Sequence, residues 1–135
     1  MTKIARCCCG SLRAETAADP IIVSACHCRE CQRRTGAPFG VSAYFRKDDV
    51  TTAGTSTVYV RDGQEGRKIR AHFCPTCGTT LYWFADLRPD FIGIALGTFA
   101  DPSFPKPTRS VWEEARHEWV VFGHDMERFA QAAVR

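Results

Sequence analysis

The chain has 135 residues, of which 44% are hydrophobic and 24% charged, and its formal net charge is +3. This length and composition are typical of an ordinary globular protein with a hydrophobic core, and they exclude a disordered or fibrous chain. The small net charge excludes a strongly basic nucleic-acid-binding surface, and no apolar run reaches the ~20 residues of a transmembrane helix.

The N-terminus also lacks the long apolar stretch of a secretory signal. We therefore expect a cytoplasmic protein with one domain over residues 1–135 and with neither nucleic acid nor membrane as a partner. The eight cysteines are the unusual feature. Because cytosolic thiols stay reduced, clustered cysteines there indicate metal binding or thiol chemistry rather than disulfides.

Short runs with apolar or alternating patterns predict a mainly β protein built from packed antiparallel sheets. Turn residues such as Asp19-Pro20 and Asp62-Gly63 separate these runs. One short helix is predicted from Arg29 to just before Gly36, and a second over Asp125–Val134, where Met126, Phe129, Ala130 and Ala133 have helical spacing. The predicted strands are Ile21–Ala25, Phe39–Phe45, Ser56–Val60, Lys68–Phe73, Thr80–Phe84 and Phe91–Leu96.

The first cysteine group is Cys7, Cys8 and Cys9, followed by a glycine. On an extended backbone alternate side chains share a face, so Cys7 and Cys9 are expected to point together. Cys8 then points away, and we interpret it as a small core residue rather than a metal ligand.

The second group is a C-x-C-x-x-C arrangement of Cys26, Cys28 and Cys31. Cys26 and Cys28 share a strand-like face, while Cys28 and Cys31 lie one helical turn apart. Three converging thiolates without a fourth protein ligand describe an open, catalytic type of zinc site. His27 alternates with the cysteines and is expected to face the other way.

Three alternatives for this group remain: closure of the site by His27, a redox disulfide with a spare thiol, and a metal site that is often empty. Arg29, Arg33 and Arg34 surround the three cysteines. They can lower thiol pKa values and bind a carboxylate, although at least one of them is expected to be simply solvated.

The third group, Cys74-Pro75-Thr76-Cys77-Gly78, has the spacing of a zinc knuckle. Gly78 suits a turn that needs a positive φ. A knuckle supplies two ligands, so we predict a closed four-cysteine zinc site made of Cys7, Cys9, Cys74 and Cys77. The alternatives are a reducible disulfide and unrelated buried thiols.

The three motifs together resemble the glutathione-dependent formaldehyde-activating enzyme (GFA) family. The matching segments are Cys7–Gly10, Cys26–Arg34 and Phe73–Gly78, with Gly97–Asp101 and Trp119 similar to the family's later part. The resemblance implies a fold of the β-tent type shared with methionine sulfoxide reductase B and Rab-associated zinc proteins. It also implies a structural zinc on Cys7, Cys9, Cys74 and Cys77, and a catalytic, labile zinc on Cys26, Cys28 and Cys31.

The activity implied by the resemblance is a carbon–sulfur lyase reaction that forms or cleaves S-hydroxymethylglutathione from glutathione and formaldehyde, or a related thiol–aldehyde adduct. Arg33 and Arg34 are the expected contacts to the thiol substrate. Two other functions fit the same residues: a non-enzymatic zinc-binding module and a thiol-redox protein. No histidine is singled out as a general base.

Overall fold

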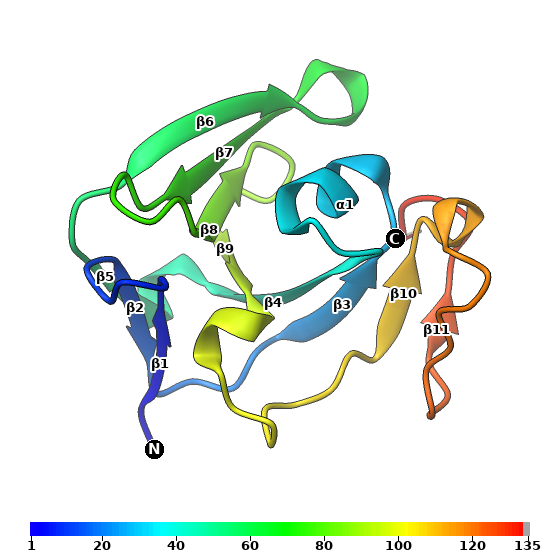
Figure 1. Ribbon diagram of the computed structural model, residues 1–135, viewed down its shortest axis with the longest axis horizontal. Coiled ribbons are helices and arrows are strands. Elements are labelled where there is room, and N and C mark those ends of the chain that lie inside the picture. The colour runs from blue at the N-terminus through cyan, green and yellow to red at the C-terminus, as the bar shows by residue number, and fades with distance from the viewer. Residues whose placement is uncertain (134–135) are drawn as a thin grey trace. The chain divides into compact units, whose positions relative to one another are not determined.

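The computed structural model describes residues 1–133 and is mainly β, as predicted. Within these residues we find no helix with the length and apolar character needed to span a bilayer. Short 3₁₀ turns occur at Lys47–Asp49, Gln64–Gly66, Leu96–Phe99 and Glu113–Ala115. The α-helix found in residues 1–133 is α1 (Arg29–Thr35) (Figure 1). The strands are β1 (Lys3–Arg6), β2 (Arg13–Thr16), β3 (Ile22–Cys26), β4 (Gly40–Arg46), β5 (Val50–Ala53), β6 (Thr57–Asp62), β7 (Lys68–Phe73), β8 (Thr80–Ala85), β9 (Phe91–Ala95), β10 (Arg109–Val111) and β11 (Glu127–Arg128).

The chain forms two compact units, and each is made from separated segments. The first unit contains Met1–Ile21 and Ala43–Phe104. The second contains Ile22–Ser42 and the described residues from Pro105 onward. The first and third cysteine groups therefore belong to the first unit, and the second group belongs to the second unit.

The first unit contains two sheets. One has the strand order β1-β2-β5, and the other continues from β4 through β9, β8 and β7 to β6. All pairings resolved within this unit are antiparallel, as in the pairing of Lys3 with Thr16 and of Arg13 with Ala53. Its core is apolar and includes Leu12, Phe45, Leu81, Ile92 and Ile94, each at most 2% exposed.

The second unit joins β11, β10 and β3 in that order, with both pairings parallel. Helix α1 follows β3 directly. It begins because Cys28, in an extended conformation, accepts a hydrogen bond from the backbone N–H of Cys31. It ends at Gly36, whose φ of 69° permits a left-handed cap in which its N–H donates to the carbonyl of Gln32. The prediction of this helix is confirmed.

The second predicted helix, over Asp125–Val134, is wrong within the described residues, and Val134 lies outside them. Strand β11 occupies Glu127–Arg128, where Glu127 pairs with Arg109 of β10. The backbone N–H groups of Trp112 and Glu113 donate to the carbonyls of Gln131 and Phe129. Pairing with a distant strand thus supersedes the local helical spacing, since amphipathic spacing is a weak signal in a short segment.

Candidate metal centres

Two tight turns of the first unit carry the first and third cysteine groups. After β1, the N–H of Cys7 donates to the carbonyl of Leu12 at 3.0 Å, and Gly10 closes the loop with a φ of 82°. Between β7 and β8, the N–H of Gly78 donates to the carbonyl of Cys74 at 2.8 Å, and Gly78 has a φ of 80°. The expected positive φ at Gly78 is confirmed.

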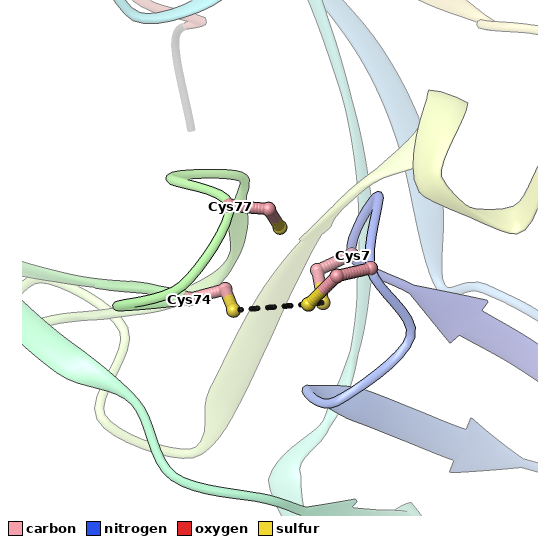
Figure 2. A group of neighbouring side chains, drawn as sticks. Cys7, Cys74 and Cys77 are labelled. Carbon is pink, nitrogen blue, oxygen red and sulfur yellow. Dashed lines mark hydrogen bonds between the residues drawn. The ribbon is translucent and has the colours of Figure 1, made fainter.

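These turns bring Cys7, Cys9, Cys74 and Cys77 together, with all four sulfur atoms within 4.8 Å of one another. The Sγ atom of Cys9 lies 3.7 Å from that of Cys7 and 3.6 Å from that of Cys74. Figure 2 shows the side chains of the knuckle turn directed toward the N-terminal loop. A tetrahedral zinc with Zn–S bonds of about 2.3 Å requires sulfur–sulfur separations of about 3.8 Å. The four-cysteine cluster can therefore hold such a metal.

Hydrogen-bond donors surround these four sulfurs. The N–H of Leu12 donates to Cys7 Sγ at 3.2 Å, and the hydroxyl of Ser11 lies 3.3 Å from Cys74 Sγ. The pKa of Cys74 is lowered to about 7, chiefly by the Ser11 hydroxyl. The Thr79 hydroxyl is the main cause that lowers the pKa of Cys77 to about 5. Both shifts favour the thiolate form, which is the form that binds metal.

Sequence reasoning missed Ser11 and Thr79. Each hydroxyl residue follows a cluster cysteine by two positions, Ser11 after Cys9 and Thr79 after Cys77. Alternate residues of an extended turn can share a face, so this spacing is the signal that could have identified them. Cys8 is outside the cluster, as expected, but its side chain is exposed, and the prediction of a core position is wrong. Its turn leaves it at the surface of the loop.

The second unit assembles the other cluster at the junction of β3 and α1. Cys26 is the last residue of β3, Cys28 is the N-cap of α1, and Cys31 lies in the first turn of α1. Their three sulfur atoms lie within 4.8 Å of one another, so this three-cysteine cluster can also hold a metal. Each of the three residues is partly exposed, which leaves the cluster accessible to a small molecule.

The three thiols strongly affect one another. The neighbouring Cys28 thiol raises the pKa of Cys26, and burial raises it further. The Cys26 thiol lowers the pKa of Cys31, but the Cys28 thiol and burial outweigh this effect, so the pKa of Cys31 is also raised. Three thiolates at this separation repel one another without a cation, so the donor set is one that a metal ion would stabilise.

His27 faces away from the cysteine side chains, as its alternation with Cys26 and Cys28 predicted. Its side chain is fully buried and packs against the rings of Phe39 and Phe122, with centroid distances of 5.6 and 5.9 Å. Burial lowers its pKa and favours the neutral ring. His27 therefore does not close the three-cysteine cluster.

The arginines around this cluster have different positions. Arg34 lies beside Cys31, and a Cβ atom added at Gly40 would lie 2.7 Å from its Nη2 atom and 3.5 Å from Cys31 Cβ. The positive charge of Arg34 opposes, to a small extent, the rise in the pKa of Cys31. The side chain of Arg33 is 71% exposed, lies 3.3 Å from the Glu30 carboxylate and borders a pocket of about 370 Å³ that also includes Gln32 and His117. Arg29 is exposed, and so it fits the expectation of a solvated arginine.

The fold is mainly β, and each of the two cysteine clusters can hold a metal ion. The class that these features define is a mainly β protein with cysteine-based metal sites. The family model described as glutathione-dependent formaldehyde-activating enzyme (GFA) matches residues 2–115, and the chain belongs to this family. A crystal structure of a Rhodobacter sphaeroides protein has a similar fold, with a TM-score of 0.55 and 23% identity over 70% of this chain and 85% of that one. A search of curated proteins finds no match.

Proposed function

We propose that the chain is a zinc-dependent, carbon–sulfur lyase-like enzyme that forms or cleaves a thiol–aldehyde adduct of the S-hydroxymethylglutathione type. The observation that carries this proposal is the three-cysteine cluster, which a structural zinc protein with a four-cysteine site would not need. Membership of the GFA family supports glutathione and formaldehyde, or a related small thiol and aldehyde, as the substrates. We propose a cytoplasmic location, because free, clustered thiols fit a reducing compartment.

The two clusters have different proposed roles. Cys7, Cys9, Cys74 and Cys77 hold a structural zinc that joins the N-terminal loop to the knuckle turn. Cys26, Cys28 and Cys31 would hold a second zinc. A zinc ion bound there would lower the pKa of the substrate thiol, so that a thiolate is present near neutral pH.

The reaction joins the thiol sulfur to the carbonyl carbon, and the thiol proton ends on the carbonyl oxygen. In the reverse direction the carbon–sulfur bond breaks, the hydroxyl proton returns to sulfur and the aldehyde leaves. The chain contributes by holding both reactants together, which raises their effective concentration. Arg34 beside Cys31 provides a guanidinium group for a carboxylate of a peptide thiol such as glutathione, and the exposed Arg33 on the same helix provides a second.

Zinc per chain, measured before and after dialysis against glutathione, tests the proposed sites. We expect two zinc ions, one of which glutathione loosens. The Cys28→Ser variant should retain one zinc and a folded structure but lose adduct formation from glutathione and formaldehyde. Cys8→Ser is the matched control, because Cys8 is an exposed cysteine outside both clusters. A fully active or unfolded Cys28→Ser protein would contradict the assignment of the three-cysteine cluster as the catalytic zinc site.

The zinc measurement and a thiol titration with mild oxidant address the two alternatives. One zinc per chain, unaffected by glutathione, would favour a binding module that needs only the four-cysteine site. Thiols of Cys26, Cys28 and Cys31 that disappear under mild oxidant and return under reductant would favour a redox protein, because a metal-bound trio resists such oxidation.

A further inference from the structure

His27 is the one residue of the C-H-C segment for which the proposed reaction has no use, yet its side chain is fully buried. Its Nε2 atom lies 2.9 Å from the hydroxyl oxygen of Ser110, which is also fully buried. That hydroxyl in turn makes a short hydrogen bond to the Glu113 carboxylate. Arg128 at 3.2 Å and Arg116 at 3.3 Å hold this carboxylate in place.

The direction of each hydrogen bond in the series His27–Ser110–Glu113 follows from the number of protons available. An ionised carboxylate only accepts, so Ser110 must give its single proton to Glu113. The Ser110 oxygen can then only accept from the imidazole, and His27 must carry its proton on Nε2. The other ring nitrogen, Nδ1, is buried and has no hydrogen-bond partner among the described residues. A proton on Nδ1 would leave an unpaired buried donor, so this nitrogen is unprotonated.

The backbone of His27 is held from both sides as well. Its N–H donates to the carbonyl of Val111 at 3.1 Å, and its carbonyl accepts from the side-chain amide of Gln32 at 2.8 Å. Val111 is also the register partner of Cys26 in the pairing of β10 with β3. Because His27 is held at its ring, its N–H and its carbonyl, its backbone has little rotational freedom. The backbones of Cys26 and Cys28, on either side of it, are restricted as well.

We propose that His27, in the tautomer protonated at Nε2, is a positioning residue that orients Cys26 and Cys28 toward Cys31 through Ser110 and Glu113. The series His27–Ser110–Glu113, whose first two members are fully buried, acts behind the three-cysteine cluster and touches no substrate. This inference deepens the proposed function, because it concerns the same cluster. Partners of this kind typically alter metal affinity by about 10–100-fold when they are removed.

The first test is the ¹⁵N NMR spectrum of the histidine ring in the intact protein. We expect the Nε2 atom of His27 to be protonated and Nδ1 to be unprotonated, and the Ser110→Ala variant to change the Nε2 signal. The opposite tautomer in the wild-type protein would overturn the proposal.

The second test compares two substitutions of His27. His27→Gln places an amide donor near the position of Nε2, whereas the side chain of His27→Asn is one carbon shorter and cannot reach Ser110. His124→Gln is the matched control, because the His124 ring hydrogen-bonds only the Pro107 carbonyl among the described residues. We expect His27→Asn and Ser110→Ala to weaken cobalt(II) binding at the three-cysteine cluster about 10-fold or more, with the glutamine variant within about 3-fold of wild type.

A trivalent arsenical that bridges neighbouring thiols provides a metal-independent measurement in the zinc-free protein. Peptide mapping locates the bridge between residues 26 and 31. His27→Asn should slow this capture about 10-fold, while capture at the four-cysteine cluster stays unchanged. Equal capture by the asparagine, glutamine and wild-type proteins would overturn the positioning role. A wild-type cluster that captures arsenical but binds no zinc would instead contradict the proposed function and leave this inference standing.

Discussion

At the scale of single residues, two hydroxyl groups complete the four-cysteine cluster. The Thr79 hydroxyl accepts from the N–H of Cys8 at 3.1 Å and lies 3.3 Å from Cys77 Sγ. Since its lone pair serves Cys8, its proton is available to the Cys77 sulfur. The Ser11 hydroxyl has one proton and three neighbouring sulfurs, Cys9 at 3.1 Å, Cys74 at 3.3 Å and Cys7 at 4.0 Å. Both hydroxyls therefore stabilise negative charge on the cysteine sulfurs.

Removing either hydroxyl should weaken the proposed structural zinc site. We expect Ser11→Ala and Thr79→Val to lower zinc affinity about 10-fold each, because the thiolates lose a donor outside the coordination sphere. Competition with a chromophoric chelator measures this affinity. Thr76→Val is the matched control, because it makes the same change in the same turn at an exposed side chain without a hydrogen bond in the described structure. An affinity equal to that of this control would contradict the assignment.

Some residues of the site could be predicted from the sequence and others could not. The grouping of the cysteines could be predicted, because backbone geometry alone determines which side chains of a strand or turn share a face. The orientation of the buried His27 ring away from the cysteine side chains could be predicted for the same reason. Ser110 and Glu113 could not, because they reach His27 only through the pairing of β10 with β3, and nothing local in the sequence indicates that pairing. The different positions of Arg33 and Arg34 likewise depend on tertiary contacts.

At the scale of elements, the pairing of β8 with β9 depends on a glycine, which has no side chain to collide with the opposite strand. Trp83 and Gly93 are register partners. A Cβ atom added at Gly93 would lie 2.2 Å from Nε1 of the Trp83 ring, which is inside van der Waals contact. The tryptophan side chain is 9% exposed and packed in the core of the first unit, so it has little room to move.

Gly93→Ala should therefore destabilise the protein by about 1–3 kcal/mol, the usual range for overpacking a core. Urea unfolding at fixed zinc concentration measures the change in free energy of unfolding. Gly97→Ala is the control, since its added Cβ would meet no atom within 4 Å, and it should change stability by less than about 0.5 kcal/mol. Equal effects of the two substitutions would show that Trp83 can move aside.

The predicted elements agree best with the structure where the pattern is regular, either alternating as in Lys68–Phe73 or continuously apolar as in Phe91–Leu96. The strand predicted over Lys68–Phe73 matches β7, and Phe91–Leu96 differs from β9 by one residue. Strands β1, β2 and β5 were missed because they have only four residues each and mixed polarity. Short strands take their stability from their partners, so a local pattern does not identify them.

At the scale of the whole molecule, the four-cysteine cluster joins segments that are far apart in the chain. A bound metal stabilises only the folded form, because the unfolded chain does not bring these cysteines together. At a free zinc concentration 1,000 times the dissociation constant, one such site adds about 4 kcal/mol to the free energy of unfolding.

We therefore expect the urea midpoint of unfolding to rise with buffered free zinc and to fall when a chelator removes it. The Cys74→Ser variant should lose most of this dependence, because a three-ligand remnant binds zinc more weakly. The Cys8→Ser variant should retain it. A wild-type midpoint that does not respond to zinc would rule out a structural metal at this cluster.

The positions of the two clusters in the sequence also set the order in which their cysteines are synthesised. Cys26, Cys28 and Cys31 lie within one short segment, so their thiols leave the exit tunnel together, long before Ser110 and Glu113 have been made and can hold His27 between them. The other cluster must wait until Cys77 has been made and β7 and β8 can pair. During synthesis the chain therefore exposes its open cluster first, and a nascent chain short of zinc would be vulnerable to oxidation there before its structural site exists.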